Sequence, residues 1–184
     1  MPRLFHWARN PAGLLGICIL LLLGCPEEKT ETKKTDKIPN ITIEKFSLTE
    51  TKEGKKLWVL DAVTANVYDN LINVDTVRIN FYGEKQTVSS ILTSRQGILN
   101  TTSRDIVVKD HVVLWTDDSS RLYTDSLFWQ NDSQKILTDS RVRIVKKDST
   151  VIEGNGLKTT PDLKKIEIIG DIKGTSPIQF PKIR

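Results

Sequence analysis

Residues 122–144 read LYTDSLFWQNDSQKILTDSRVRI, and this stretch decides the fold. Apolar and polar residues alternate on both sides of a polar centre, which contains the turn-forming pair Asn131-Asp132. Alternation at every second position places one set of side chains on one face of a pleated strand. The stretch therefore predicts two antiparallel strands joined by a short polar turn.

The same pattern recurs on both sides of this stretch. Residues 93–114 (TSRQGILNTTSRDIVVKDHVVL) and residues 152–174 (IEGNGLKTTPDLKKIEIIGDIKG) align with it. A unit of two strands cannot bury its apolar face alone, so neighbouring units must stack side by side. The repeat predicts strands of about eight residues, or ~26 Å each. Equivalent apolar positions lie 30 residues apart, namely Ile106, Ile136 and Ile166, and also Val112, Val142 and Ile172.

The remaining sequence also favours strands over helices. After the N-terminal leader the chain holds only two alanines, Ala62 and Ala65, and no long stretch has the spacing of an amphipathic helix. We predict an all-β domain of roughly a dozen or more short strands, which forms a flattened roll or an open trough with apolar side chains inside. The predicted turns are Glu53-Gly54, Asp69-Asn70, Tyr82-Gly83, Asp117-Asp118, Asn131-Asp132, Lys147-Asp148 and Pro161-Asp162.

The leader predicts export and a lipid anchor. Its apolar run, residues 12–24, is 13 residues long, whereas a membrane-spanning helix needs ~20. Arg3 and Arg9 precede the run, as in a signal peptide. Residues 22–25 (LLGC) resemble the bacterial lipobox, in which the cysteine thiol receives a diacylglycerol and becomes the new N-terminus. We predict lipid attachment at Cys25, with a short uncleaved membrane anchor as the alternative.

Composition divides the rest of the chain into a linker and one domain. Without residues 1–24, the 27 basic side chains lose Arg3 and Arg9, so 25 face 23 acidic ones and the net charge is +2. This balance gives no reason to expect a nucleic acid partner. Residues 25–40 carry balanced charges and form a polar linker. Residues 41–184 have the length of a single domain.

The sequence offers no constellation for catalysis or for a metal. His111 has no histidine partner beyond the leader, and the scattered aspartates lack the spacing of a calcium loop. We therefore expect no enzyme activity, no metal and no cofactor. Trp58, Trp115 and Trp129 lie on predicted strands, where they form part of the core or line the groove.

Three of these segments resemble one protein family. They are GKKLWVLDAVTANVYDNL at 54–71, SRLYTDSLFWQNDSQKILTDSRVRI at 120–144 and VIEGNGLKTTPDLKKIEIIGDIKG at 151–174. Together they resemble the LptC family of the OstA-like superfamily, the periplasmic component of the lipopolysaccharide-export ABC transporter, over roughly residues 41–174. The lipobox is a departure, since many family members keep an uncleaved transmembrane helix.

The resemblance implies an elongated, twisted, boat-shaped β-jellyroll of short antiparallel strands with an apolar groove. Such a protein takes lipopolysaccharide acyl chains from the inner-membrane ABC transporter and passes them to a periplasmic bridge protein of the same fold. It implies a location on the periplasmic side of the inner membrane, here through a lipid anchor, rather than in the outer membrane. The residues predicted to line the lipid-binding face are Trp58, Leu60, Val74, Ile79, Ile98, Ile106, Leu127, Ile136, Val142 and Ile144.

An open roll also leaves an unpaired strand at each end. We predict that the edge near residues 41–48 faces the transporter and that the C-terminal unit, residues 163–174, is the edge for the bridge protein. The predicted partner-edge residues are Ile166, Ile168, Gly170 and Ile172. The alternative function is a structural or adhesive β-solenoid lipoprotein of the cell envelope, for which a closed core is expected.

Overall fold

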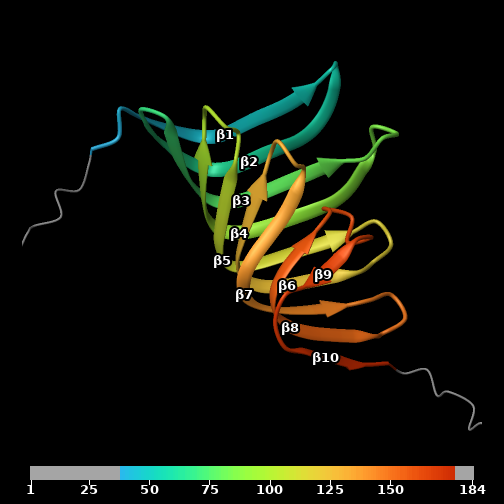
Figure 1. Cartoon of the computed structure of the whole chain (residues 1–184). Helices are drawn as coiled ribbons and strands as arrows, with labels where there is room; N and C mark the ends of the chain where they lie inside the picture. The colour runs from blue at the N-terminus through green and yellow to red at the C-terminus, as the bar shows by residue number, and fades with distance from the viewer. Residues whose placement is uncertain (1–37, 177–184) are drawn as a thin grey trace, which may run out of the picture. The chain divides into compact units, whose positions relative to one another are not determined.

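The structure is a computed structural model and describes residues 38–176. The predicted signal peptide, Cys25 and all but the last three residues of the predicted linker lie outside the described residues. Residues 38–176 contain no helix that is long and apolar enough to cross a membrane. Their strands, shown in Figure 1, are β1 (Ile41–Lys52), β2 (Lys55–Tyr68), β3 (Leu71–Tyr82), β4 (Val88–Asn100), β5 (Ile106–Thr116), β6 (Arg121–Gln130), β7 (Lys135–Val145), β8 (Val151–Thr159), β9 (Ile166–Ile168) and β10 (Ile172–Thr175).

The strands form one open antiparallel sheet in which neighbours follow chain order. β1 to β8 pair consecutively, and β9 and β10 both pair with β8. This confirms the all-β, jellyroll-like fold class. The predicted number and length of the strands are wrong, because β1 to β8 are 9 to 14 residues long. Several long strands bend in the middle, where the prediction expects two shorter strands.

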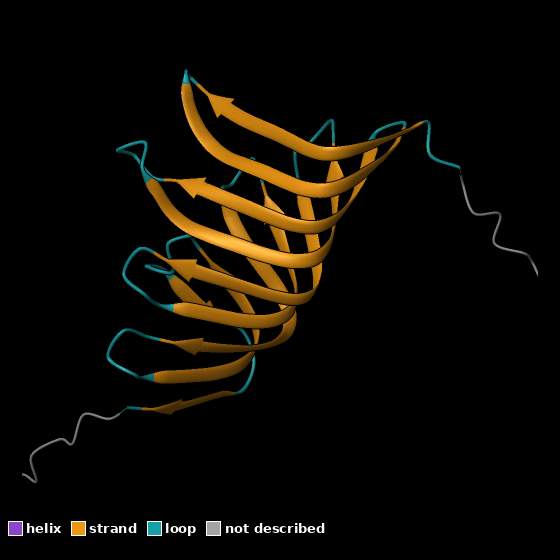
Figure 2. Ribbon diagram, turned by 180° about the vertical axis from the view of Figure 1, so that it is seen from behind, coloured by secondary structure: helices purple, strands orange, loops and turns teal. Residues whose placement is uncertain are grey.

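The bends lie in a seam that crosses the middle of the sheet. A bulge inserts an extra residue into a strand and bends it, and left-handed backbone at Thr76, Asp110 and His111, with φ of 55°, 67° and 55°, accompanies the seam. Figure 2 shows the long strands curving at this point. Pairing shifts register between Thr93 and Gln96, Lys109 and Val112, Thr124 and Phe128, and Thr138 and Arg141.

The seam divides the sheet into two layers. The first layer contains the strand halves that meet at the β1–β2, β3–β4, β5–β6 and β7–β8 turns, and the second layer contains the other halves. The two halves of β8 even have different partners, since β10 pairs with residues 151–154 and β9 pairs with residues 157–159. The layers touch at Phe81 in the first layer and Trp129 in the second, whose ring centroids are 4.9 Å apart. The apolar core therefore lies between the layers.

Burial between the layers holds the fold together. Each fully buried large apolar side chain contributes ~1.5–3 kcal/mol relative to leaving it in water. The largest such side chains come from seven strands, so the core extends along the length of the sheet. They are Trp58, Leu60, Ile79, Phe81, Leu99, Ile106, Leu114, Leu122, Leu127, Ile136, Ile144 and Leu157.

Candidate functional site

The inner face of the sheet is the apolar surface between the two layers. Nine of the ten residues predicted for it are buried there, all with side chains no more than 2% exposed. They are Trp58, Leu60, Val74, Ile79, Ile106, Leu127, Ile136, Val142 and Ile144. The structure thus shows where these side chains lie, and their contact with lipid is a proposal taken up below.

The assignment of Ile98 to this face is wrong. Counting every second residue from the buried Leu92 leads through the buried Ser94 to Ile98, but two successive exposed residues, Arg95 and Gln96, follow Ser94 at the seam. This break in the alternation moves the later side chains of β4 to the opposite face. Gly97 and Leu99 are therefore buried, and Ile98 lies on the outer face beside Val107.

The tryptophans divide in the same way between the two faces. Trp58 and Trp129 are buried in the core, with exposed fractions of 0% and 5%. Trp115 pairs with Ile91 on the outer face and is 39% exposed, so it belongs neither to the core nor to the inner face. His111 is exposed and contacts the Asp110 carboxylate, whose pKa that hydrogen bond lowers.

The inner face becomes exposed at its N-terminal end. Ile41 and Ile43 of β1 stand opposite Val67 and Ala65 of β2, in the same row of inward side chains. Ala65 is buried, whereas Ile43 is 36% exposed and Ile41 is 58% exposed. Two branched apolar side chains therefore continue the core into solvent at the edge strand.

The same face becomes exposed at its C-terminal end. Ile172 of β10 is opposite Gly154, which is opposite the fully buried Val142. Ile172 itself is 63% exposed. The apolar row is thus covered in the middle of the sheet and open at both edge strands.

The C-terminal edge contains the four residues predicted to contact a partner. Ile166 and Ile168 are half-buried on β9, and Gly170 and Ile172 are exposed. Within residues 38–176, β9 and β10 pair with β8 on one side and with no strand on the other. The Ile169 N–H donates to the Gly156 carbonyl at 3.2 Å, and antiparallel alternation therefore turns the Ile168 N–H outward.

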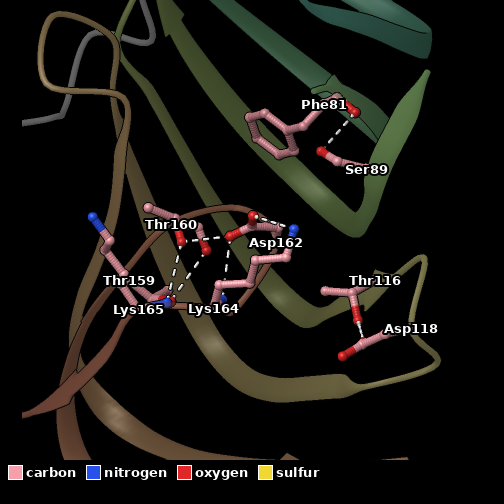
Figure 3. A network of polar contacts seen from close by, with 9 residues as sticks. All are labelled: Phe81, Ser89, Thr116, Asp118, Thr159, Thr160, Asp162, Lys164 and Lys165. Carbon is pink, nitrogen blue, oxygen red and sulfur yellow. Dashed lines mark hydrogen bonds and ion pairs between the residues drawn. The ribbon is translucent and has the colours of Figure 1, made fainter. Parts of the chain in front are cut away.

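A hollow of about 630 Å³ lies between the layers on the side away from the seam. We call this side of the inner face, where the turns of the two layers approach each other, the mouth. The apolar wall of the hollow is formed by Leu57, Phe81 and Trp129, and Lys85 and Lys164 stand at its rim. Figure 3 shows the polar contacts of the turns around this mouth. The hollow combines an apolar wall with charged groups of both signs, since Glu84, Asp117 and Asp162 also line it.

Two turns of similar sequence shape this rim. In one, the Thr116 hydroxyl hydrogen bonds to the Asp118 carboxylate and lowers its pKa, helped by the Ser120 N–H at 3.0 Å. In the other, burial raises the pKa of Asp162, but hydrogen bonds led by that from Thr160 outweigh it and the pKa falls. Both carboxylates therefore stay ionised at neutral and mildly acidic pH.

Comparison with known proteins agrees with this architecture. The sequence profile of one family, described as Lipopolysaccharide-assembly, LptC-related, matches residues 12–176. A search of the curated proteins finds no match. The profile covers nearly the whole chain, including every described strand. The chain therefore belongs to the LptC-related family of lipopolysaccharide assembly, a transport component that works on the periplasmic side of the inner membrane.

Proposed function

We propose that this protein binds lipopolysaccharide acyl chains along its inner face and passes them from the ABC transporter to a periplasmic bridge protein. The observation that carries the proposal is the exposure of the apolar row at both edge strands, at Ile41 and Ile43 on one side and Ile172 on the other. Acyl chains cost ~0.8 kcal/mol per methylene in water. An apolar surface that continues past each edge spares them that exposure.

The two edges suit opposite partners. A sheet edge with free backbone groups is a template for another strand. A strand added to β1 or to β9 and β10 would extend the inner face without a gap. We assign the β1 edge to the transporter and the β9–β10 edge to the bridge protein. An adhesive or structural role predicts a closed core, and the exposed isoleucines at both ends of the sheet do not favour it.

Crosslinking tests the lipid-binding face. A photo-crosslinking residue at Ile43 or Ile172 is expected to trap lipopolysaccharide in cells, because both side chains lie on the inner face and are exposed. Their exposure also lets a bulky replacement fit without disturbing the core. Thr42 and Lys173 are matched controls, since each is the exposed neighbour on the outer face. Equal crosslinking at inner and outer positions would contradict the proposed face.

The proposed anchor is a separate question. Cys25 lies outside the described residues, and the motif LLGC at 22–25 supports acylation of its thiol. Cys25→Ser is expected to abolish metabolic labelling with a fatty-acid probe and to leave residues 1–24 attached. Labelling that persists in the variant, or a wild-type protein that begins at Met1, would favour the uncleaved anchor instead.

A further inference from the structure

Asn131 joins the two layers at the mouth of the inner face. Its side-chain oxygen accepts hydrogen bonds from the indole N–H groups of Trp58, at 3.0 Å, and Trp129, at 3.1 Å. Trp58 belongs to β2 in the first layer, whereas Trp129 and Asn131 belong to the second layer. An indole N–H only donates, so both bonds require the oxygen of the carboxamide and fix its orientation.

The position of Asn131 is set by a neighbouring turn. Its backbone N–H donates to the Asp105 carboxylate at 2.9 Å, which ties the β6–β7 turn to the β4–β5 turn. From the same β4–β5 turn, the Arg104 guanidinium forms an ion pair with the Glu50 carboxylate of β1, with Nε and Oε2 3.5 Å apart. This partly exposed ion pair also crosses between the layers, but such a pair contributes less than ~1 kcal/mol. Asn131 is thus the better shielded of the two polar links.

The seam and the mouth are at opposite sides of the core. At the seam the chain continues from one layer to the other through bulges, so the layers cannot separate there. Away from the seam they are joined through side chains, namely the Asn131 bonds, the contact between Phe81 and Trp129 and the weaker Arg104–Glu50 ion pair. The layers can therefore part only at the mouth, by bending at the seam.

The two layers must separate before lipid reaches the middle of the inner face. Residues such as Leu60 and Ile136 are at most 1% exposed, so an acyl chain contacts them only after the layers part. Parting the layers breaks the Trp58–Asn131 bond. We propose, building on the proposed function, that Asn131 is a catch that holds the mouth closed and limits the rate at which acyl chains enter.

The catch is tested by Asn131→Ala in the full chain. Loss of both bonds is expected to raise the open population and the association rate of fluorescein-labelled lipopolysaccharide by about tenfold. Asn131→Asp keeps an acceptor oxygen and is expected to associate no faster than the wild type. Ser133→Ala is the control in the same turn, because among the described residues the Ser133 hydroxyl bonds locally, to the side chain of Gln130 at the end of β6, at 2.8 Å.

A measurement without lipid separates the catch from lipid binding. In a background with Trp7 and Trp115 replaced by phenylalanine, all tryptophan fluorescence comes from Trp58 and Trp129, and acrylamide quenching of that emission reports how accessible they are. Asn131→Ala is expected to increase quenching at least twofold, and Ser133→Ala is expected to leave it unchanged. Unchanged quenching and an unchanged association rate in Asn131→Ala would overturn the catch.

Trp58→Phe provides a second route if Asn131→Ala folds poorly. It removes the bond between the layers, keeps an aromatic ring in the core and is expected to speed lipopolysaccharide association as Asn131→Ala does. A rate equal to that of the wild type would overturn the catch. A wild-type protein that binds no lipopolysaccharide contradicts the proposed function, and the quenching of Asn131→Ala still decides whether Asn131 holds the layers together.

Discussion

Ile168→Pro is expected to abolish binding of the periplasmic bridge protein while leaving the domain folded. Ile168 lies on β9, where its N–H points away from β8 and so remains available to a strand of the partner. Proline removes that donor and restricts the edge backbone. Because no hydrogen bond to β8 depends on the Ile168 N–H, the sheet itself keeps its pairing.

The comparison that isolates the backbone is Ile168→Ala. Alanine removes most of the side chain but retains the N–H, so it is expected to bind the bridge protein nearly as well as the wild type in a pull-down. The circular dichroism spectrum should show the same strand signal in all three proteins. Capture of the bridge protein by the proline variant at the wild-type level would contradict docking through this edge.

Gly154→Val is expected to detach β9 and β10 from the rest of the sheet. A Cβ atom at Gly154 would lie 2.5 Å from the Ile168 Cγ2 and 3.0 Å from the Asp171 carbonyl oxygen. Both distances are too short, and a branched side chain makes the overlap worse. Overpacking of this kind costs ~1–3 kcal/mol, and here it falls on a short segment that β8 alone holds.

Urea unfolding and hydrogen exchange measure this effect. The free energy of unfolding should fall, and the amides of β9 and β10 should lose protection more than those of β5 and β6. Gly174→Ala is the matched control on the same edge, since the nearest atom to its Cβ, the Val151 carbonyl oxygen, is 4.0 Å away. Wild-type protection of β9 and β10 in Gly154→Val would mean that this segment needs no close approach to β8.

The turns were the most predictable part of the fold. All seven predicted turn pairs lie at or beside the ends of strands, because Gly, Asn and Asp carry the local chemistry of a turn. The β4–β5 turn was missed, since residues 101–104 (TTSR) lack these types. The signal was one residue earlier, where the Asn100 side-chain oxygen accepts from the Thr102 and Ser103 N–H groups at 2.9 and 3.1 Å.

The alternation of apolar and polar residues predicted which side chains face inward, except where burial shifts by one position within a strand. Arg95 and Gln96 are both exposed, which breaks the alternation in β4, and their residue types do not show that break, so Ile98 was placed on the wrong face. The seam was hidden for a related reason, because threonine is a β-branched type that rarely adopts left-handed backbone, so nothing in the sequence indicates it at Thr76. The strands were consequently expected to be shorter and more numerous than they are.

The link at Asn131 could not be predicted from the sequence. Asn131 was identified as a turn residue, and Trp58 as a core or groove residue, but 73 positions separate them. Their contact depends on how far the layers fold toward each other. Gly154 and Gly156 lie in the family-like segment 151–174, and the structure supplies a reason for each, with Gly156 at a φ of +74° and Gly154 packed against Ile168.

The pairing of strands in chain order has a consequence for how this domain folds. From β1 to β8, every ladder joins two strands that a single turn connects, so the loops that must close are short and folding is fast for an all-β protein. Within residues 38–176, strands in the middle pair on both sides, whereas β1, β9 and β10 each pair on one. Native-state opening should therefore begin by fraying at the two ends and reach β5 and β6 last. The surfaces proposed to meet the two partners are then the parts of the domain that rearrange at the lowest cost.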